Sequence, residues 1–255
     1  MEYRAKPNQS VMRFHNHFET NERGMRSPSL IGETRPYAIV AGDSVVFGGA
    51  MIDQAELATT LLSNDNRLVA NLSAGTWGPQ NMRAALQAND DLQPTGIVVV
   101  LSAHDLADVP TFAPLDPRTH PRKAPLLAIA ELVTNYLPRY LPGFATQAIA
   151  APAPQMLQVG AGLYQDLLDQ LTGDRAPSCI VFHPDRAELG TGDSAALHDI
   201  KRLTAAAGLA TVDAAPFYRA AQGDIYLDAI HLNAVGQTAL AAAIGACLAL
   251  IGPPA

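Results

Sequence analysis

The chain has 255 residues, 48% of them hydrophobic, and a formal net charge of −7 at pH 7. This length allows one large domain or two small ones, with a sizeable buried core. The acidic balance argues against nucleic acid or an anionic lipid surface as the main partner. The two cysteines, Cys179 and Cys247, are too few for a disulfide framework or a cysteine metal cluster. Both lie in apolar segments, so we expect buried thiols.

Residues 1–36 are mostly polar and charged, with no sustained apolar run. We expect no signal peptide here, and we expect this segment to wrap the edge of a sheet as an N-terminal extension. Residues 37–255 are expected to form the main domain. The longest apolar run, 239–252, is shorter than the roughly 20 residues that span a membrane, so it predicts a helix packed on the sheet.

Strand and helix patterns alternate along the main domain. The segment 97–101, Ile-Val-Val-Val-Leu, is a continuous apolar run of the kind found in strands buried on both faces. Strands are predicted at 37–41, 68–72, 96–101, 179–182 and, weakly, 210–212. Helices are predicted at 54–63, 81–88, 126–136, 195–207 and 234–251. The alternation predicts a three-layer α/β/α domain, a flavodoxin-like doubly wound parallel sheet of about five strands.

One segment, 107–125, interrupts the alternation with many prolines and with Arg118, His120, Arg122 and Lys123. It follows the third predicted strand, and long loops at the carboxyl edge of such sheets commonly shape the substrate site. We therefore expect a loop insertion that faces the substrate, with an inert surface excursion as the alternative.

A serine follows the first predicted strand directly, in the tripeptide Gly42-Asp43-Ser44. Open α/β sheets place their active sites at this end of a strand. Near the other end of the chain, Asp228 precedes His231 by three residues. Together these residues offer a nucleophile, a base that can accept its proton, and an acid that orients the base. The alternative without a catalytic role is that Asp228 and His231 form a surface ion pair.

A second Gly-Asp-Ser, at residues 192–194, lies just before the helix predicted at 195–207. Asp193 or Ser194 is there expected to cap that helix, because a side-chain oxygen satisfies a free backbone N–H. The doublets His104-Asp105 and His198-Asp199 contain metal-ligand types, but further histidines and aspartates at helical spacing are missing. We expect no metal and no cofactor.

Three blocks of the sequence resemble those of the SGNH (GDSL-type) hydrolase family. They are Gly42-Asp43-Ser44, Gly75 within residues 71–78, and Asp228-Ala229-Ile230-His231. The resemblance implies that Ser44, Asp228 and His231 are catalytic, and that the backbone N–H groups of Ser44 and Gly75 bind the oxyanion. Gly75 lacks a Cβ atom, so its backbone can approach the substrate closely. The head of the chain is similar to members that modify bacterial exopolysaccharides, in which a membrane anchor often precedes this segment.

A fourth block departs from the family pattern. The family has Gly-x-Asn-Asp, whereas this chain has Ser102-Ala103-His104-Asp105. A neutral imidazole can donate a hydrogen bond, so we expect His104 to replace the asparagine as an oxyanion donor. After Gly75, we expect Trp77 to bind substrate or to be a buried anchor, and Gln80 and Asn81 to be auxiliary substrate-binding donors.

The resulting expectation is a serine esterase that acts through an acyl-enzyme on a small-molecule or polysaccharide ester. The resemblance favours O-acetyl or other short acyl groups on a carbohydrate. The alternatives are an O-acetyltransferase of the same fold, in which a sugar hydroxyl replaces water, and a catalytically weak polysaccharide-binding member, which the change at His104 would favour. The compartment stays open; the resemblance points to an exported or membrane-tethered protein, with membrane contact only through an anchor outside this sequence.

Overall fold

The structure, a computed structural model, describes residues 1–113, 129, 154–174 and 176–252. It divides into a main unit, Met1–Pro110 with Pro154–Ala255, and a second unit, Thr111–Ala153. The second unit lies almost wholly outside the described residues. The helix predicted at 126–136 and most of the insertion predicted at 107–125 therefore lie outside them too. The division at residue 36 stays a prediction.

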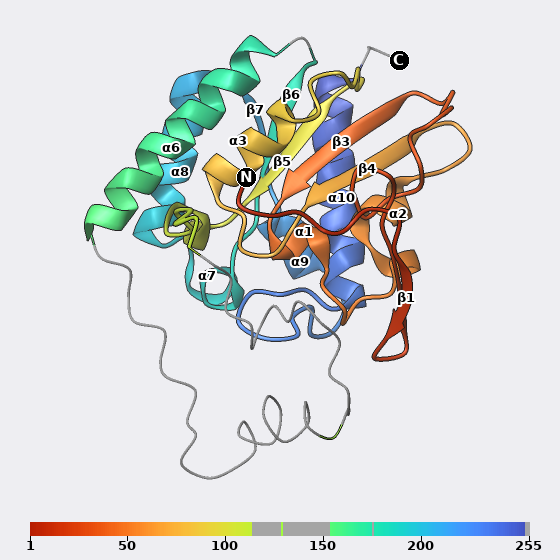
Figure 1. The fold of residues 1–255 in the computed structure, drawn as a ribbon. Helices are drawn as coiled ribbons and strands as arrows, with labels where there is room; N and C mark the ends of the chain where they lie inside the picture. Colours follow the sequence, from red (N-terminus) through yellow and green to blue (C-terminus); the bar gives the residue numbers. More distant parts are fainter. Residues whose placement is uncertain (114–128, 130–153, 175, 253–255) are drawn as a thin grey trace. The chain divides into compact units, whose positions relative to one another are not determined.

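The main unit is built on one parallel sheet with the strand order β4-β3-β5-β6-β7 (Figure 1). The strands are β3 (Tyr37–Gly42), β4 (Leu68–Ser73), β5 (Ile97–Leu101), β6 (Ser178–Phe182) and β7 (Ala210–Asp213). The chain order reverses at β3, whose neighbours are β4 and β5. Ligands of doubly wound sheets bind outside the carboxyl ends of the strands at such a switch point. The flavodoxin-like sheet that the sequence predicts is thus confirmed, and Ser44 follows the strand at its switch point.

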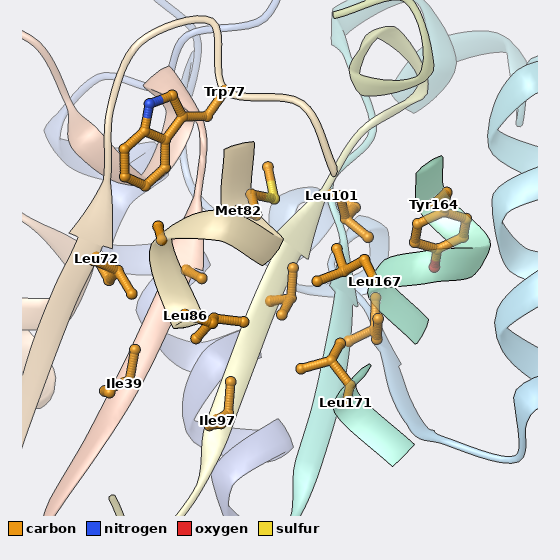
Figure 2. Close-up of a cluster of buried hydrophobic side chains, with 14 of the residues drawn as sticks. Ile39, Leu72, Trp77, Met82, Leu86, Ile97, Leu101, Tyr164, Leu167 and Leu171 are labelled. Atoms are coloured by element: carbon orange, nitrogen blue, oxygen red, sulfur yellow. The ribbon is translucent and has the colours of Figure 1, made fainter. Parts of the chain in front are cut away.

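Helices cover both faces of this sheet. Alternate residues of each strand direct their side chains to opposite faces, and the side chains on both faces are mostly apolar. One face packs against α3 (Pro79–Gln87), α6 (Pro154–Gly173) and α8 (Ala195–Ala207). The other packs against α1 (Ser44–Phe47), α2 (Ala58–Leu62), α9 (Ala215–Ala220) and α10 (Ala234–Ile251). Figure 2 shows the first core, to which the sheet contributes Ile39 and Leu101, α3 contributes Met82, and α6 contributes Leu167. The three-layer α/β/α architecture is confirmed.

Among the described residues, α10 is the helix long and apolar enough to cross a membrane, with a mean hydropathy of 1.9 over 18 residues. It packs on β6 and β7 and on the short helices α2 and α9. Its side chains Leu240 and Ile244 are fully buried in the second core. A core helix of this kind meets the same length and composition criterion, and the packing on the sheet is the one predicted from the sequence.

The expectation of two free thiols is wrong. Cys179 of β6 and Cys247 of α10 form a disulfide, with their Cα atoms 5.8 Å apart. Both residues are fully buried, as predicted. Their separation of 68 positions carries no spacing signal, and only the packing of α10 on β6 brings the two sulfur atoms together.

The first 36 residues contain a hairpin of β1 (Ser10–Arg13) and β2 (Asn16–Glu19) and run beside strand β4. The N–H of Arg26 donates to the carbonyl of Asn71 at 3.2 Å, and the N–H of Asn71 donates to Ser27 Oγ at 2.6 Å. The fully buried Arg26 guanidinium donates to the carbonyls of Phe47 and Ile52. It thereby holds the loop that follows α1.

Candidate active site

Ser44 lies at the sharp turn between β3 and α1. A Cβ atom on Gly42 would come within 2.4 Å of Val46 Cγ2, so only glycine lets the strand pack this closely on the helix. Asp43 caps α1, because its Oδ1 accepts the N–H of Val45 at 2.9 Å. Ser44 is consequently the first residue of the helix, and its hydroxyl faces the carboxyl edge of the sheet.

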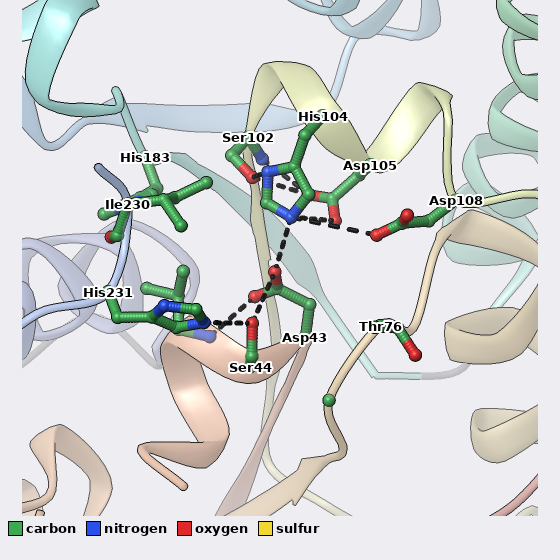
Figure 3. A network of polar contacts seen from close by, with 12 residues as sticks. Asp43, Ser44, Thr76, Ser102, His104, Asp105, Asp108, His183, Ile230 and His231 are labelled. Carbon is green, nitrogen blue, oxygen red and sulfur yellow. Dashed lines mark hydrogen bonds and ion pairs between the residues drawn. The ribbon is translucent and has the colours of Figure 1, made fainter. Parts of the chain in front are cut away.

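Ser44, His231 and Asp228 form a continuous hydrogen-bonded chain, of which Figure 3 shows the contact between Ser44 and His231. Ser44 Oγ lies 2.9 Å from His231 Nε2, and His231 Nδ1 lies 2.7 Å from Asp228 Oδ2. With Nδ1–H donating to the carboxylate, Nε2 is left to accept the proton of the serine hydroxyl. Residues 187 positions apart therefore meet in the arrangement of nucleophile, base and orienting acid.

The carboxylate of Asp228 is kept ionised by its own loop. Its Oδ1 accepts the N–H groups of Ile230 at 2.9 Å and of His231 at 2.8 Å. Burial opposes ionisation, but these two hydrogen bonds and the contact with His231 outweigh it and lower the pKa of Asp228. The acid is thus a charged acceptor that fixes the orientation of the imidazole.

His104 lies on the other side of Ser44, in the short 3₁₀ helix η2 (Ala103–Leu106) that follows β5. Its Nε2 is 2.9 Å from Asp43 Oδ2, and its Nδ1 is 2.8 Å from Ser102 Oγ. Both ring nitrogens are therefore engaged within the protein. The oxyanion-donor role of His104 stays a prediction. It requires that the Nε2–H group donate to the oxyanion as well as to Asp43.

Three carboxylates surround the imidazole of His104. Besides Asp43, Asp105 Oδ1 lies 3.7 Å and Asp108 Oδ2 lies 3.8 Å from Nε2. Burial disfavours the charged ring, but Asp105 and Asp43 outweigh it and raise the pKa of His104 to about 10. Burial and the charge of Asp43 in turn raise the pKa of Asp105 well above its ordinary value. The site thus contains an imidazolium beside the ionised Asp43.

Asp43, His104 and Asp105 also place one potential metal ligand atom each within 4.8 Å of one another, the one such group found among the described residues. Each carboxylate already caps a backbone N–H: Asp43 that of Val45, and Asp105 that of Ser102 at 2.7 Å. His104 and Asp43 are joined by a hydrogen bond. The three residues thus form an ion-pair network in which the buried Asp105 Oδ1 makes no hydrogen bond.

The remaining predicted residues follow β4. Gly75 is partly exposed, and Thr76 beside it is exposed with a φ of +54°. Trp77 is 1% exposed and its Nε1 donates to the carbonyl of Tyr3 at 3.0 Å, which is the buried-anchor alternative rather than a contact surface for substrate. Asn81 is also buried, and its Oδ1 accepts the N–H of Glu2 at 2.8 Å; its substrate-binding role stays a prediction.

Gln80 is half-buried on α3 and makes no hydrogen bond with Ser44 or His231, so its substrate-binding role stays a prediction. One residue near Gly75 was not anticipated from the sequence. The hydroxyl of Tyr3 donates to the carbonyl of Gly75 and contacts Thr76 Oγ1. No local motif marks Tyr3, because its partners lie more than 70 positions away.

A cavity of about 400 Å³ opens beside Ser44 and His231. Its lining is largely apolar and comes from the loop after α1, from the loop that carries His231, and from the start of α10. The lining residues are Ser44, Val45, Gly48, Gly49, Met51, Leu227, Asp228, His231, Leu232 and Gln237. An acyl chain bound to Ser44 Oγ can therefore extend into this apolar cavity.

No protein-family model matches the sequence, and no curated protein matches it. Solved structures match in fold. TesA has a TM-score of 0.52 at 14% identity, over 84% of this chain and 99% of that chain. A two-domain esterase (CEX) active on acetylated mannans has a TM-score of 0.52 at 13% identity, over 87% of this chain. The match spans about half of that esterase, 52% of its length.

A putative SGNH hydrolase from Slackia heliotrinireducens matches over 84% of this chain and all of its own length, with a TM-score of 0.44 at 15% identity. The class that the fold defines is a three-layer α/β protein with a serine at the switch point of its sheet. Within that class, the chain shares its fold with TesA and with the two-domain esterase.

Proposed function

We propose that the protein is an SGNH-type serine esterase that acts through an acyl-enzyme. The observation that carries this proposal is the unbroken chain from Ser44 Oγ to His231 to Asp228, with distances of 2.9 and 2.7 Å. Nothing in the packing of the fold requires these three polar side chains, which are partly exposed, to meet. Their meeting also argues against a member that only binds polysaccharide.

The reaction follows from the positions of the protons. Ser44 Oγ attacks the ester carbonyl carbon while His231 Nε2 takes the hydroxyl proton, and Asp228 stabilises the imidazolium that forms. Collapse of the tetrahedral intermediate breaks the bond to the alcohol, which leaves with the proton from His231. Water then attacks the acyl-enzyme while His231 accepts its proton. Collapse of the second intermediate breaks the bond to Ser44 Oγ, His231 returns the proton to Oγ, and the acid is released.

The oxyanion of the intermediate is proposed to lie against the N–H groups of Ser44 and Gly75. Ser44 is at the first position of α1, where backbone N–H groups have no partner within the helix. The positively charged ring of His104, which lies beside Asp43, is proposed to stabilise the negative charge of the oxyanion. Its Nε2–H group is then shared between Asp43 and the oxyanion.

The proposed substrate is a carbohydrate or polysaccharide that carries O-acetyl or other short acyl groups. The likeness in fold to an esterase active on acetylated mannans supports the substrate class. The apolar cavity beside Ser44 supports an acyl group there, because sugar hydroxyls would need polar partners that its lining supplies sparingly.

The proposal is tested with p-nitrophenyl acetate, an acetylated manno-oligosaccharide and a serine-directed fluorophosphonate. Wild type is expected to hydrolyse the esters and to be labelled, whereas Ser44→Ala loses both properties. Ser194→Ala is the matched control, because Ser194 belongs to the second Gly-Asp-Ser and only caps α8, accepting the N–H of Leu197 at 3.2 Å. Folded wild type that is neither labelled nor active on either ester would contradict the proposal.

A further inference from the structure

The loop that carries the base, residues 224–233 (the catalytic loop), holds Asp228 and His231 together by its own hydrogen bonds. Asp228 accepts two N–H groups of the loop, and the N–H of Leu227 donates to the carbonyl of His231 at 2.7 Å. These bonds fix the acid against the imidazole. They do not fix the loop against α1, where Ser44 lies, so other contacts must set the distance between His231 and Ser44.

One set of these contacts comes from residues 183–186 (the supporting segment), which join β6 to α7 (Arg186–Thr191). Three consecutive carbonyl groups of the catalytic loop accept hydrogen bonds from it. The carbonyl of Asp228 accepts Arg186 Nε at 3.1 Å, and that of Ala229 accepts the Arg186 N–H at 2.8 Å. The carbonyl of Ile230, the residue before the base, lies 3.1 Å from His183 Nε2.

His183 is fully buried at the carboxyl end of β6. Burial lowers the pKa of His183 to about 4, so the ring is neutral near pH 7. Because Nε2 faces a carbonyl oxygen, the proton is on Nε2, and Nδ1 accepts the hydroxyl of Tyr218 at 2.7 Å. The rings of Tyr218 and Tyr226 pack edge-on against His183, with centroids 5.5 and 6.2 Å away. These contacts with the two tyrosines hold the His183 ring, and with it the Nε2–H group that donates to Ile230, in one orientation.

Arg186 holds the start of the same loop. Its Nη2 donates to the carbonyl of Tyr226 at 3.0 Å and to Asp224 Oδ2 at 3.1 Å. Its guanidinium carbon lies 5.4 Å from the centre of the Tyr226 ring, within cation–π range. Tyr226 in return donates its hydroxyl to the carbonyl of Pro184 at 2.6 Å. The supporting segment therefore contacts the catalytic loop at both ends of the Asp228-to-His231 turn.

We infer that His183 and Arg186 are positioning residues that set the place of the catalytic base through the main chain of residues 228–230. This inference rests on the proposed function, since it concerns the same base. Loss of either side chain leaves Asp228 paired with His231 but lets the loop shift relative to α1. The alignment of Nε2 with Ser44 Oγ then weakens, while the cavity and the oxyanion groups stay in place.

The first test is Arg186→Met, which keeps the aliphatic stem of a half-exposed side chain and removes its donors. We expect kcat for p-nitrophenyl acetate to fall roughly 10- to 100-fold, because a misplacement of about 1 Å costs up to about 100-fold. KM and the pH of half-maximal activity on the acidic limb are expected to stay at wild-type values. Arg202→Met is the matched control, an exposed arginine paired with Asp199 on α8, and it is expected to keep wild-type kcat.

The second test compares His183→Gln with His183→Leu. Glutamine can place an N–H near the position of Nε2 and is expected to restore most of kcat, whereas leucine has no donor and is expected to lose it. Melting temperatures identify the folded variants, and if neither His183 variant folds, Arg186→Met decides. A folded Arg186→Met enzyme with wild-type kcat overturns the inference. A fall in kcat together with a shift of the acidic limb of the pH–activity profile also overturns it, because the Asp228–His231 pair itself would then have changed.

Failure of the proposed function looks different. In that case wild type itself is not labelled by the fluorophosphonate and does not hydrolyse the esters. With an active wild type, every outcome of the variant series bears on the positioning role alone.

Discussion

Nε2 of His104 lies 2.9 Å from Oδ2 of Asp43, the residue immediately before the candidate nucleophile. The same Asp43 oxygen is 3.4 Å from Ser44 Oγ. Ser44 is therefore flanked by two histidine–aspartate pairs, His231 with Asp228 and His104 with Asp43. Burial opposes ionisation of Asp43, but the hydrogen bond and charge of His104 outweigh it and lower the pKa of Asp43. The first pair can move a proton, whereas the second is held as a fixed ion pair.

The role of His104 is tested by two substitutions. His104→Ala removes the positive charge and the N–H, and kcat for p-nitrophenyl acetate is expected to fall by about 100- to 1,000-fold, the effect of losing one oxyanion donor. His104→Asn restores the residue of the family pattern and is expected to retain or raise activity. Wild-type rates in the folded alanine variant would remove His104 from the site.

The same ion pair makes stability depend on pH. The pKa of His104 is raised to about 10 in the folded state, against about 6.5 for an unperturbed histidine. The folded state therefore binds the proton more tightly, and the stabilisation is complete below about pH 6.5 and is lost as the pH rises through about 10. We expect the melting temperature of wild type to fall more between pH 7 and 10 than that of His104→Asn. Parallel curves for the two proteins would contradict this assignment.

The parallel sheet was predictable because its strands are apolar runs, and the helices at 195–207 and 234–251 have the predicted bounds. Helix α6 was not predicted, because Gly160 and Gly162 interrupt its pattern. A Cβ atom on Gly160 would lie 1.8 Å from the carbonyl oxygen of Leu106, so this glycine permits close packing on η2. The hairpin of β1 and β2 was missed because all the residues of both strands are exposed or half-buried, which leaves no apolar alternation.

The site was predictable where its chemistry is local. Ser44 ends a strand and Asp228 precedes His231 by three residues, so each block can be recognised alone. The contacts of Tyr3, His183 and Arg186 could not be predicted, because each binds main-chain carbonyls more than 40 positions away, and a carbonyl leaves no trace in a residue pattern.

The disulfide between Cys179 and Cys247 is expected to stabilise the fold. It closes a loop of about 68 residues between the interior strand β6 and helix α10, and cross-links of this kind contribute about 2–4 kcal/mol. The double variant Cys179→Ala with Cys247→Ala should show that loss in urea unfolding, with esterase activity retained at 25 °C. Thiol titration of the unfolded, unreduced protein checks the bond itself. Disulfides persist under oxidising conditions. Two reactive thiols per chain in oxidised protein would therefore contradict the disulfide.

The cavity beside Ser44 predicts how activity depends on acyl length. Met51 lines it on the side of the loop after α1 and is 57% exposed, so a larger side chain can be placed there without disturbing the core. Met51→Trp is expected to lower kcat/KM for p-nitrophenyl butyrate and hexanoate several-fold, because the longer chains lose apolar space that acetate does not reach. Ile31→Trp, at a position 77% exposed and outside the cavity lining, is the matched control and should leave the chain-length profile unchanged. An equal fall for acetate and hexanoate in Met51→Trp would show that the acyl chain does not enter this cavity.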